Sequence, residues 1–202
     1  MTMAIKDNFG NPSGFIGKIM LSGMNMGHTP MAKWAFTQFL VPDEGNMVDV
    51  GCGGGFNIKR LIEKSANGVV FGVDISETSV KKSKAVNKKY LGKRCDVYRA
   101  SADELPFDDN VMELVTAFET VYFWQNMEDC FLEIKRVLKP GGKFVIINDP
   151  GDPNKHWDEM IPDMTSWTAE QLEAFMEKTG YTDIKISKNK FMFAVCGTKA
   201  AN

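Results

Sequence analysis

The residues best placed to do chemistry lie in the stretch 48–55, which reads VDVGCGGG. Glycines let the backbone turn tightly and approach a ligand that a Cβ atom would push away. Asp74 ends the next apolar run, and a carboxylate about 20 residues beyond such a loop can accept hydrogen bonds from both hydroxyls of a ribose. The two features together predict a βαβ unit that binds a nucleoside.

The spacing of the glycines indicates which nucleoside the loop would hold. A dinucleotide fingerprint, Gly-x-Gly-x-x-Gly/Ala, that began at Gly51 would require a small residue at position 56. That position is Phe56, whose ring would block the close helix–strand contact and the approach of a pyrophosphate. The third glycine is instead Gly55. This spacing disfavours a nicotinamide-dependent oxidoreductase.

Three ordered motifs resemble the class I S-adenosylmethionine-dependent methyltransferases. The Gly-x-Gly-x-Gly spacing, with Asp49 before it and Asp74 after it, resembles their cofactor loop. The stretch 101–107 (SADELPF) resembles their adenine-contacting loop, and the stretch 135–143 (KRVLKPGGK) resembles their turn into the fifth strand. The resemblance is specific over about residues 47–148 and looser beyond. Within the family, the chain resembles the small-molecule branch typified by the ubiquinone/menaquinone-biosynthesis methyltransferases.

The resemblance implies S-adenosylmethionine as cofactor and S-adenosylhomocysteine as product. It implies that Asp49 orients the methionine ammonium, that Asp74 accepts from the ribose hydroxyls, and that Ile75 lies against adenine. Asp103 would accept from the adenine amino group while the Ala102 backbone donates to the ring. Each residue also has a plain structural interpretation, as a turn glycine, a helix cap or a loop-ordering group. The full set implied to bind the cofactor is Asp49, Gly51, Cys52, Gly53, Gly55, Asp74, Ile75, Ser101, Ala102, Asp103 and Phe118.

Methyl transfer from a sulfonium is an in-line displacement, so the protein mainly has to align the reactants and exclude water. The stretch 118–124 (FETVYFW) follows the expected fourth strand, where the family places residues that meet the methyl group. It departs from the Asn/Asp-Pro-Pro-Tyr/Phe motif of relatives that methylate adenine or glutamine, which weakens a nucleic-acid or protein-amide substrate. The candidate catalytic residues are Glu119, Tyr122 and His28.

Each catalytic candidate has an alternative. The aromatic side chains from Tyr122 to Trp124 could hold the sulfonium by cation–π attraction, about 1–2 kcal/mol when desolvated, or could only pack the core. Glu119 could accept a substrate proton or face solvent in a turn. His28 and His156 could each act as a base or be structural. With two histidines and no clustered cysteines, we expect no metal.

Short apolar runs alternate with helical patterns along most of the chain, which is typical of a parallel sheet with helices on both faces. The last two expected strands are separated only by residues 188–190, too few for a parallel crossover, so they should form an antiparallel hairpin. The predicted fold class is α/β, a single Rossmann-like three-layer sandwich with a seven-stranded, mostly parallel sheet and an antiparallel C-terminal strand. The expected strands are Met47–Val50, Val69–Asp74, Asp96–Ala100, Leu114–Phe118, Lys143–Asn148, Ile184–Ser187 and Phe191–Gly197.

Two segments fall outside this scaffold. Residues 1–44 are apolar and rich in methionine, and we expect them to form a helical lid over residues 45–202, the cofactor-binding domain. The segment 150–167 is an insertion of undetermined role. It precedes the stretch 168–171 (TAEQ), which predicts a capping box that opens a helix.

Composition limits the possible partners. With 202 residues and 44% hydrophobic content the chain has room for one α/β domain, and a formal net charge of −2 argues against nucleic-acid binding. Four scattered cysteines indicate reduced thiols and a cytoplasmic protein, and the absence of a long apolar run argues against a membrane span. The sequence therefore predicts an enzyme that methylates a small, possibly hydrophobic molecule. The alternative is a module that binds S-adenosylmethionine without turnover.

Overall fold

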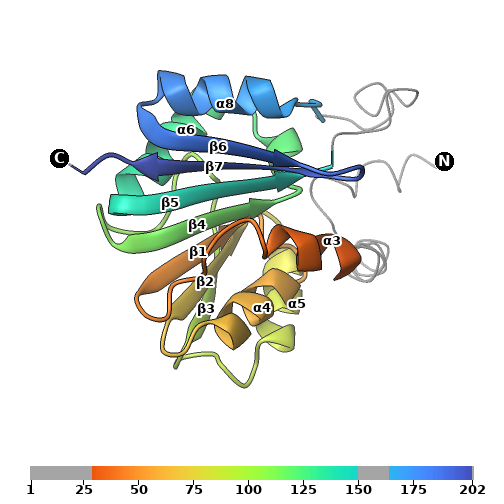
Figure 1. Cartoon of the computed structure of the whole chain (residues 1–202). Coiled ribbons are helices and arrows are strands. Elements are labelled where there is room, and N and C mark those ends of the chain that lie inside the picture. The colour runs from red at the N-terminus through yellow and green to blue at the C-terminus, as the bar shows by residue number, and fades with distance from the viewer. Residues whose placement is uncertain (1–28, 150–163, 202) are drawn as a thin grey trace.

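The computed structural model describes residues 29–149 and 164–201. Its centre is a seven-stranded sheet in the order β3-β2-β1-β4-β5-β7-β6 (Figure 1). The predicted fold class is confirmed. The strands are β1 Asn46–Val50, β2 Val69–Asp74, β3 Cys95–Arg99, β4 Met112–Phe118, β5 Leu138–Asn148, β6 Tyr181–Lys188 and β7 Phe193–Lys199.

The strand pairing is parallel from β3 across to β5 and antiparallel at the C-terminal end. Strand β1 pairs with β2 and β4, while β7 runs antiparallel to both β5 and β6. The expected hairpin is therefore confirmed. Because the chain steps outward from β1 to β3 and returns on the other side of β1 at β4, the strand order reverses between β1 and β4. In open α/β sheets, ligands bind at the carboxyl edge of such a switch point.

Several strand boundaries differ from the sequence prediction by one or two residues, and the starts of β5, β6 and β7 have identifiable causes or larger shifts. Strand β5 begins at Leu138 rather than Lys143, because the stretch before the glycines already pairs with β4 and a register shift absorbs the irregularity. Strand β6 begins at Tyr181 rather than Ile184, directly after Gly180. Strand β7 begins at Phe193 rather than Phe191, because the Asn189 side chain accepts from the backbone N–H groups of residues 191 and 192 at 2.7 and 2.9 Å and holds them in the turn.

The helices begin where the sequence offers caps. Ser76 accepts from the Ser79 N–H group at the start of one helix, and Thr168 forms the predicted capping box with Gln171. Gly180, with φ of +78°, follows the end of the last helix. The helices are α3 Thr29–Ala35, α4 Phe56–Lys64, α5 Glu77–Val86, the 3₁₀ turn η1 Val121–Phe123, α6 Met127–Val137 and α8 Ala169–Lys178.

The helices form two layers around the sheet. Helices α3, α4 and α5 cover one face, and α6 and α8 cover the other (Figure 1). Side chains alternate across each strand, so Val145 and Ile147 of β5 face α3 and α4, while Phe144 and Ile146 face α6 and α8. The three-layer arrangement is as predicted. None of the helices in the described ranges is long and apolar enough to span a membrane.

The start of the described chain packs on the sheet. Of the predicted N-terminal segment, residues 1–28 lie outside the described residues. At the end of α3 and just beyond it, the side chains of Ala35, Phe36 and Phe39 are buried in the core on the α4 side of the sheet. The Phe36 ring lies 5.4 Å from the ring of Phe118 at the end of β4, measured between centroids. The division into a lid and a core domain stays a prediction.

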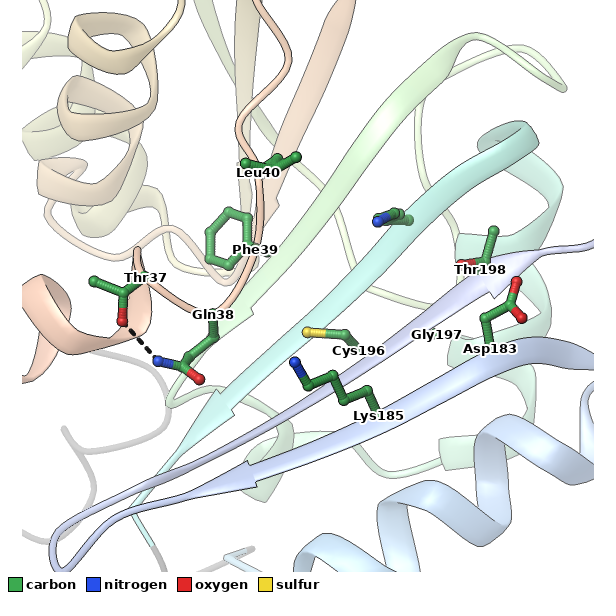
Figure 2. A pocket seen from close by; sticks show the side chains of 10 residues that line it. Thr37, Gln38, Phe39, Leu40, Asp183, Lys185, Cys196, Gly197 and Thr198 are labelled. Atoms are coloured by element: carbon green, nitrogen blue, oxygen red, sulfur yellow. Dashed lines mark hydrogen bonds between the residues drawn. The ribbon is translucent and has the colours of Figure 1, made fainter.

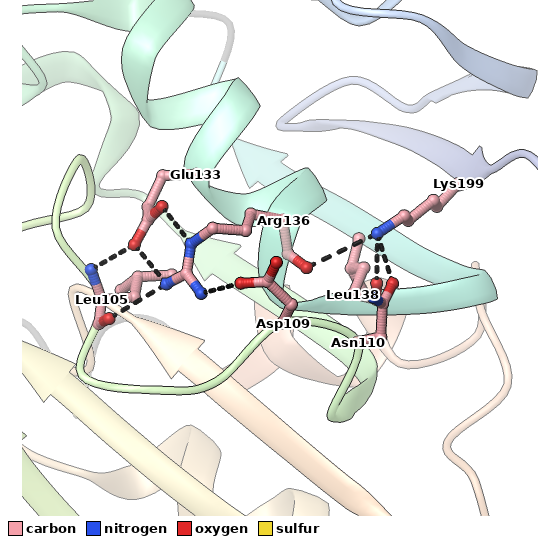
Figure 3. Close-up of polar contacts among 7 residues, drawn as sticks. All are labelled: Leu105, Asp109, Asn110, Glu133, Arg136, Leu138 and Lys199. Carbon is pink, nitrogen blue, oxygen red and sulfur yellow. Dashed lines mark hydrogen bonds and ion pairs between the residues drawn. The ribbon is translucent and has the colours of Figure 1, made fainter.

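A polar network fixes the loop that follows β3 (Figure 3). Arg136 of α6 donates to both carboxylate oxygens of Glu133 at 2.7 Å and to Asp109 at 2.6 Å. Glu133 accepts in turn from the Leu105 N–H group at 2.7 Å. Lys199 of β7 donates to the Leu138 carbonyl at 2.7 Å. Charge-assisted hydrogen bonds of this kind are the strong ones, so the loop is held against α6.

Candidate functional site

The glycine-rich loop closes over the carboxyl ends of β1 and β2. The backbone N–H groups of Gly51 and Cys52 donate to the Val73 carbonyl at 2.8 and 3.0 Å. Gly51 has φ of +71°, and a Cβ atom there would lie 1.9 Å from the Thr120 hydroxyl oxygen. The first glycine is therefore needed for close packing against the loop after β4, in addition to any ligand contact.

Asp74 ties this loop to the start of α5. One carboxylate oxygen accepts from the Gly53 N–H group and the other from the Ser76 N–H group, each at 2.8 Å. The residue is 9% exposed, and burial raises its pKa, an effect that these two backbone hydrogen bonds oppose. A carboxylate has about four lone-pair positions, so both oxygens can still accept a ribose hydroxyl.

Asp49 is a buried acid beneath the loop. It is 1% exposed, and burial raises the pKa of its carboxyl to about 7. The Thr116 hydroxyl donates to this carboxyl at 2.8 Å. This hydrogen bond and the positive charge of Arg60 both lower the pKa of Asp49, but by less than burial raises it. Near neutral pH this group can therefore gain its charge when a cation binds close to it.

A cavity of about 200 Å³ opens at the switch point between β1 and β4. Six of the predicted cofactor residues line it together. Ile75 is 44% exposed there, although large apolar side chains are usually buried, and it offers a flat apolar face. The Ser101 hydroxyl donates to the Asp103 carboxylate at the mouth. The six lining residues are Gly51, Asp74, Ile75, Ser101, Ala102 and Asp103.

Sequence reasoning missed part of the wall. Thr120, Phe123, Gln125 and Cys130 also line the cavity, and Thr120 packs directly against Gly51 of the glycine loop. The aromatic run before α6 indicated part of this wall in the sequence. Gln125 and Cys130 were not indicated, because Gln125 lies in a polar turn and Cys130 lies on the apolar stripe of a helix. Trp124 packs in the core, where its ring stacks on Phe144 with a centroid separation of 6.4 Å, and it also lines the cavity, so its contact with the sulfonium stays a prediction.

Other predicted cofactor residues lie behind the cavity wall. The Cys52 sulfur points toward the Ser83 hydroxyl at 3.8 Å, and burial raises the pKa of its thiol. Gly55 packs against Ser83 and Asn87 of the α5 region, where a Cβ atom would lie 2.3 Å from the nearest atom. Phe118 packs against the N-terminal region as described above. Direct contact of Cys52, Gly53, Gly55, Asp49 and Phe118 with the cofactor stays a prediction.

The catalytic candidates gather at the carboxyl ends of β4 and β5. Glu119 has φ of +51°, an uncommon conformation for a residue with a side chain, and its N–H group donates to the Ile147 carbonyl at 2.8 Å. The Tyr122 hydroxyl accepts from the Asp149 N–H group at 3.0 Å. Burial raises the pKa of Tyr122 well above its usual value, so its phenol is neutral at physiological pH. His28 lies outside the described residues.

A second hollow, of about 570 Å³, lies on the α3 side of β5, β7 and β6, away from the carboxyl edge (Figure 2). Lys143, Lys185 and Cys196 line it. Burial raises the pKa of the Cys196 thiol to about 11 although both lysines oppose the shift, so the thiol is protonated at neutral pH. The hollow is not where an open α/β sheet binds its cofactor.

The fold and the glycine–aspartate site define a class I S-adenosylmethionine-dependent methyltransferase. Residues 48–146 match the family model described as a methyltransferase domain. The chain therefore contains a domain of this family, and S-adenosylmethionine is the cofactor that this family uses. The residues at the cavity fit that cofactor, with a carboxylate for a ribose, an exposed isoleucine for a purine face and Asp103 for an amino group.

Known proteins with similar sequences include methyltransferases of several kinds. The chain is 35% identical over 100 residues to 24-methylenesterol C-methyltransferase 2 of Arabidopsis thaliana, covering 49% of this chain and 27% of that protein. It is 24% identical over 168 residues to the uncharacterized methyltransferase YdaC of Bacillus subtilis, covering 82% of this chain and 88% of that one. The chain thus spans only about a quarter of the plant sterol methyltransferase.

A solved structure supports the fold. The geranyl diphosphate C-methyltransferase of Streptomyces coelicolor, solved with geranyl diphosphate and S-adenosyl-L-homocysteine, has a TM-score of 0.70 and 15% identity. The match covers 85% of this chain and 77% of that chain. At this identity the likeness establishes the fold alone.

Proposed function

We propose that this protein transfers the methyl group of S-adenosylmethionine to a small, largely apolar acceptor. The observation that carries the proposal is the arrangement of Asp74. Its two oxygens connect the glycine loop to the start of α5, and the residue at the same time lines the cavity at the switch point. A carboxylate that only capped a helix would not need to face an open cavity beside an exposed Ile75.

When bound, S-adenosylmethionine supplies a methyl group that is activated by its sulfonium. An electron pair of the acceptor forms the new bond to the methyl carbon while the carbon–sulfur bond breaks, and the electrons of that bond go to sulfur. Asp49 would hold the methionine ammonium by charge, and Asp74 would hold the ribose by hydrogen bonding. Phe123 and Trp124 exclude water from the far wall of the cavity. If the acceptor loses a proton, Glu119 at the end of β4 is the carboxylate we propose to receive it.

The chemistry of the acceptor is proposed from the relatives and the cavity. The sterol and geranyl diphosphate methyltransferases that the chain resembles carry, in their names, acceptors with large apolar bodies. The aromatic wall of this cavity supports a similar class for this protein. The net charge of −2 supports an acceptor other than nucleic acid. Quinols, suggested by the resemblance to the quinone-biosynthesis branch, belong to the same apolar class.

Two further parts of the proposal concern the surroundings of the site. Residues 1–44 would act as a lid that excludes water when cofactor and acceptor are bound, because an apolar, methionine-rich segment is costly to leave in solvent. The four cysteines, unpaired in the structure, support the cytoplasm as the compartment.

A turnover screen tests the function. The purified protein is incubated with S-adenosylmethionine and with separate panels of sterols, geranyl diphosphate, quinols and simple phenols, and S-adenosylhomocysteine is quantified. We expect its formation to depend on one acceptor class and to be lost in the Asp74→Ala variant. Binding of the cofactor without turnover on any panel would contradict the proposal and favour the non-catalytic binding module.

A further inference from the structure

Strand β5 ends in an asparagine whose side chain is buried without a partner. Asn148 has no exposed surface, and within the described part of the chain neither its amide nitrogen nor its amide oxygen has a hydrogen-bond partner. Buried polar side chains are nearly always hydrogen-bonded, and an apolar side chain of the same size would fit such a position at lower cost. The amide therefore points to a partner that the described residues 29–149 and 164–201 do not provide.

Asn148 faces the α6 and α8 side of the sheet. Side chains alternate along β5, and Phe144 and Ile146 lie on that side. Its neighbour on β7 is Phe193, which belongs to the same core. The amide thus lies at the carboxyl edge of the sheet, one strand beyond β4.

A second buried polar group lies over the same face. The indole N–H group of Trp167 is also buried, with no acceptor among the described residues. Its ring packs on Phe175 of α8 with a centroid separation of 5.4 Å. Trp167 immediately precedes the capping box, so it sits where α8 begins, and α8 begins at the carboxyl edge because it runs back toward the start of β6.

Hydrogen bonds from backbone groups near Asn148 and Trp167 reach the catalytic candidate Tyr122. The Asp149 N–H group donates to the Tyr122 hydroxyl at 3.0 Å, which places the phenol beside the end of β5. The Thr165 N–H group donates to the Tyr122 carbonyl at 2.8 Å, which holds the segment before Trp167 against η1. The two unpartnered groups therefore border the same edge as Glu119 and the cofactor cavity.

We propose that Asn148 and Trp167 bind the polar group of the methyl acceptor, and that this group is a neutral hydroxyl. The inference rests on the proposed function. A hydroxyl oxygen can accept from the indole N–H and the amide N–H groups, and its proton can be donated to the amide oxygen. A carboxylate or phosphate would leave the amide oxygen without a donor. The acceptor is thus an apolar molecule with a hydroxyl, held by its polar end while its body contacts the aromatic wall.

The first test measures stability and needs no ligand. If the amide is kept for binding, Asn148→Leu removes an unpaired buried group, and the melting temperature should stay level or rise by about 2–4 °C. Asn87→Leu is the matched control, because the buried Asn87 amide donates to the carbonyls of Gly55 and Ser83 at 2.9 and 3.0 Å. Since the substitution removes these hydrogen bonds, the melting temperature of the Asn87→Leu variant should fall. A fall for Asn148→Leu equal to that of the control would overturn the proposal.

The second test uses p-cresol and toluene, which differ by one hydroxyl, as probes of protein saturated with S-adenosylhomocysteine. We expect the wild-type protein to bind p-cresol about tenfold more tightly than toluene, the value of one or two good hydrogen bonds. The preference should vanish in Asn148→Leu and shrink in Trp167→Phe, while S-adenosylhomocysteine affinity stays unchanged. A wild-type protein that does not favour p-cresol, or an Asn148→Leu variant that keeps the preference, would overturn the proposal.

The two levels of the proposal fail separately. If no acceptor panel yields S-adenosylhomocysteine while the p-cresol preference depends on Asn148, the methyltransferase function fails and the hydroxyl site stands as a binding site. If turnover occurs but Asn148→Leu leaves both the preference and the Michaelis constant of the acceptor unchanged, the hydroxyl site fails and the function stands.

Discussion

At the residue scale, we expect the charge state of Asp49 to depend on whether the cofactor is bound. Its carboxyl has a pKa of about 7 because it is buried, well above the ordinary value of 3.8. In the free protein the neutral form of Asp49 is therefore favoured below about pH 7. The stability that comes from protonating this buried carboxyl is present at acidic pH and is lost as the pH rises through 7. A methionine ammonium beside the carboxyl would reverse the preference and favour the charged form.

This linkage predicts pH-dependent binding. If the cofactor lowers the pKa of Asp49 well below 6, affinity for S-adenosylhomocysteine should rise about eightfold between pH 6 and pH 7.5, because fewer protons must then be released on binding. Calorimetry in two buffers of different ionisation enthalpy measures both the affinity and the protons released. In Asp49→Asn the pH dependence should disappear. A wild-type affinity that is flat over this range would show that Asp49 does not face the ammonium.

At the residue scale the sequence predicted the cofactor side of the site better than the acceptor side. The glycines and Asp74 follow a local pattern whose geometry is fixed by one βαβ unit, so their spacing is enough. Gln125 and Cys130 reach the cavity only through the tertiary packing of η1 and α6, and Asn148 is placed at the acceptor side only by our proposal. No local pattern marks them, because each is an ordinary turn, helix or strand residue in the sequence.

Among the elements, the loop after β3 depends on one helix for its position. Arg136 of α6 holds both Glu133 and Asp109, and Glu133 holds the Leu105 backbone (Figure 3). The arginine lowers the pKa of Glu133, so this contribution to stability is present at neutral pH and is lost as the pH falls through the lowered pKa of Glu133.

Arg136→Ala should therefore lower the melting temperature by about 3–6 °C at pH 7, since it leaves a largely buried carboxylate without its main partner. The difference from the wild type should shrink as the pH falls through the lowered pKa of Glu133, where the carboxyl becomes protonated. Lys178→Ala is the matched control, because it breaks an exposed ion pair with Glu128 and should have little effect. Equal losses for the two variants would contradict the role assigned to the network.

Element types were predicted well and some element ends were not. The order of strands and the antiparallel hairpin follow from apolar runs and connection lengths, which are local quantities. The start of β5 at Leu138 and the late start of β7 depend on pairing with β4 and on the Asn189 turn. Such contacts form between distant parts of the chain, so periodicity alone could not place those ends.

At the scale of the whole molecule, the N-terminal segment divides into two parts. Residues 29–44 contribute buried Ala35, Phe36 and Phe39 to the core and belong to the folded body. The proposed lid over the site must therefore come chiefly from residues 1–28.

Truncation separates these two roles. Removing residues 1–28 should leave a folded protein with a melting temperature near that of the wild type, weaker cofactor binding and no methyl transfer. Removing residues 1–44 should also destabilise the fold, because it exposes the apolar surface under Phe36 and Phe39. Differential scanning fluorimetry and the turnover assay measure both effects. Full activity after removal of residues 1–28 would show that they are a passive extension.

The most direct measurement of the central claim is a calorimetric titration of the wild-type protein and the Asp74→Ala variant with S-adenosylhomocysteine. If Asp74 accepts from the ribose as proposed, the substitution removes two charge-assisted hydrogen bonds, so affinity should fall by more than about tenfold while circular dichroism shows an intact fold. The Asp74→Asn variant keeps the shape of the side chain and loses its charge, so its affinity for S-adenosylhomocysteine should lie between those of the wild type and Asp74→Ala. Equal affinities for the wild type and Asp74→Ala would contradict the assignment of this site.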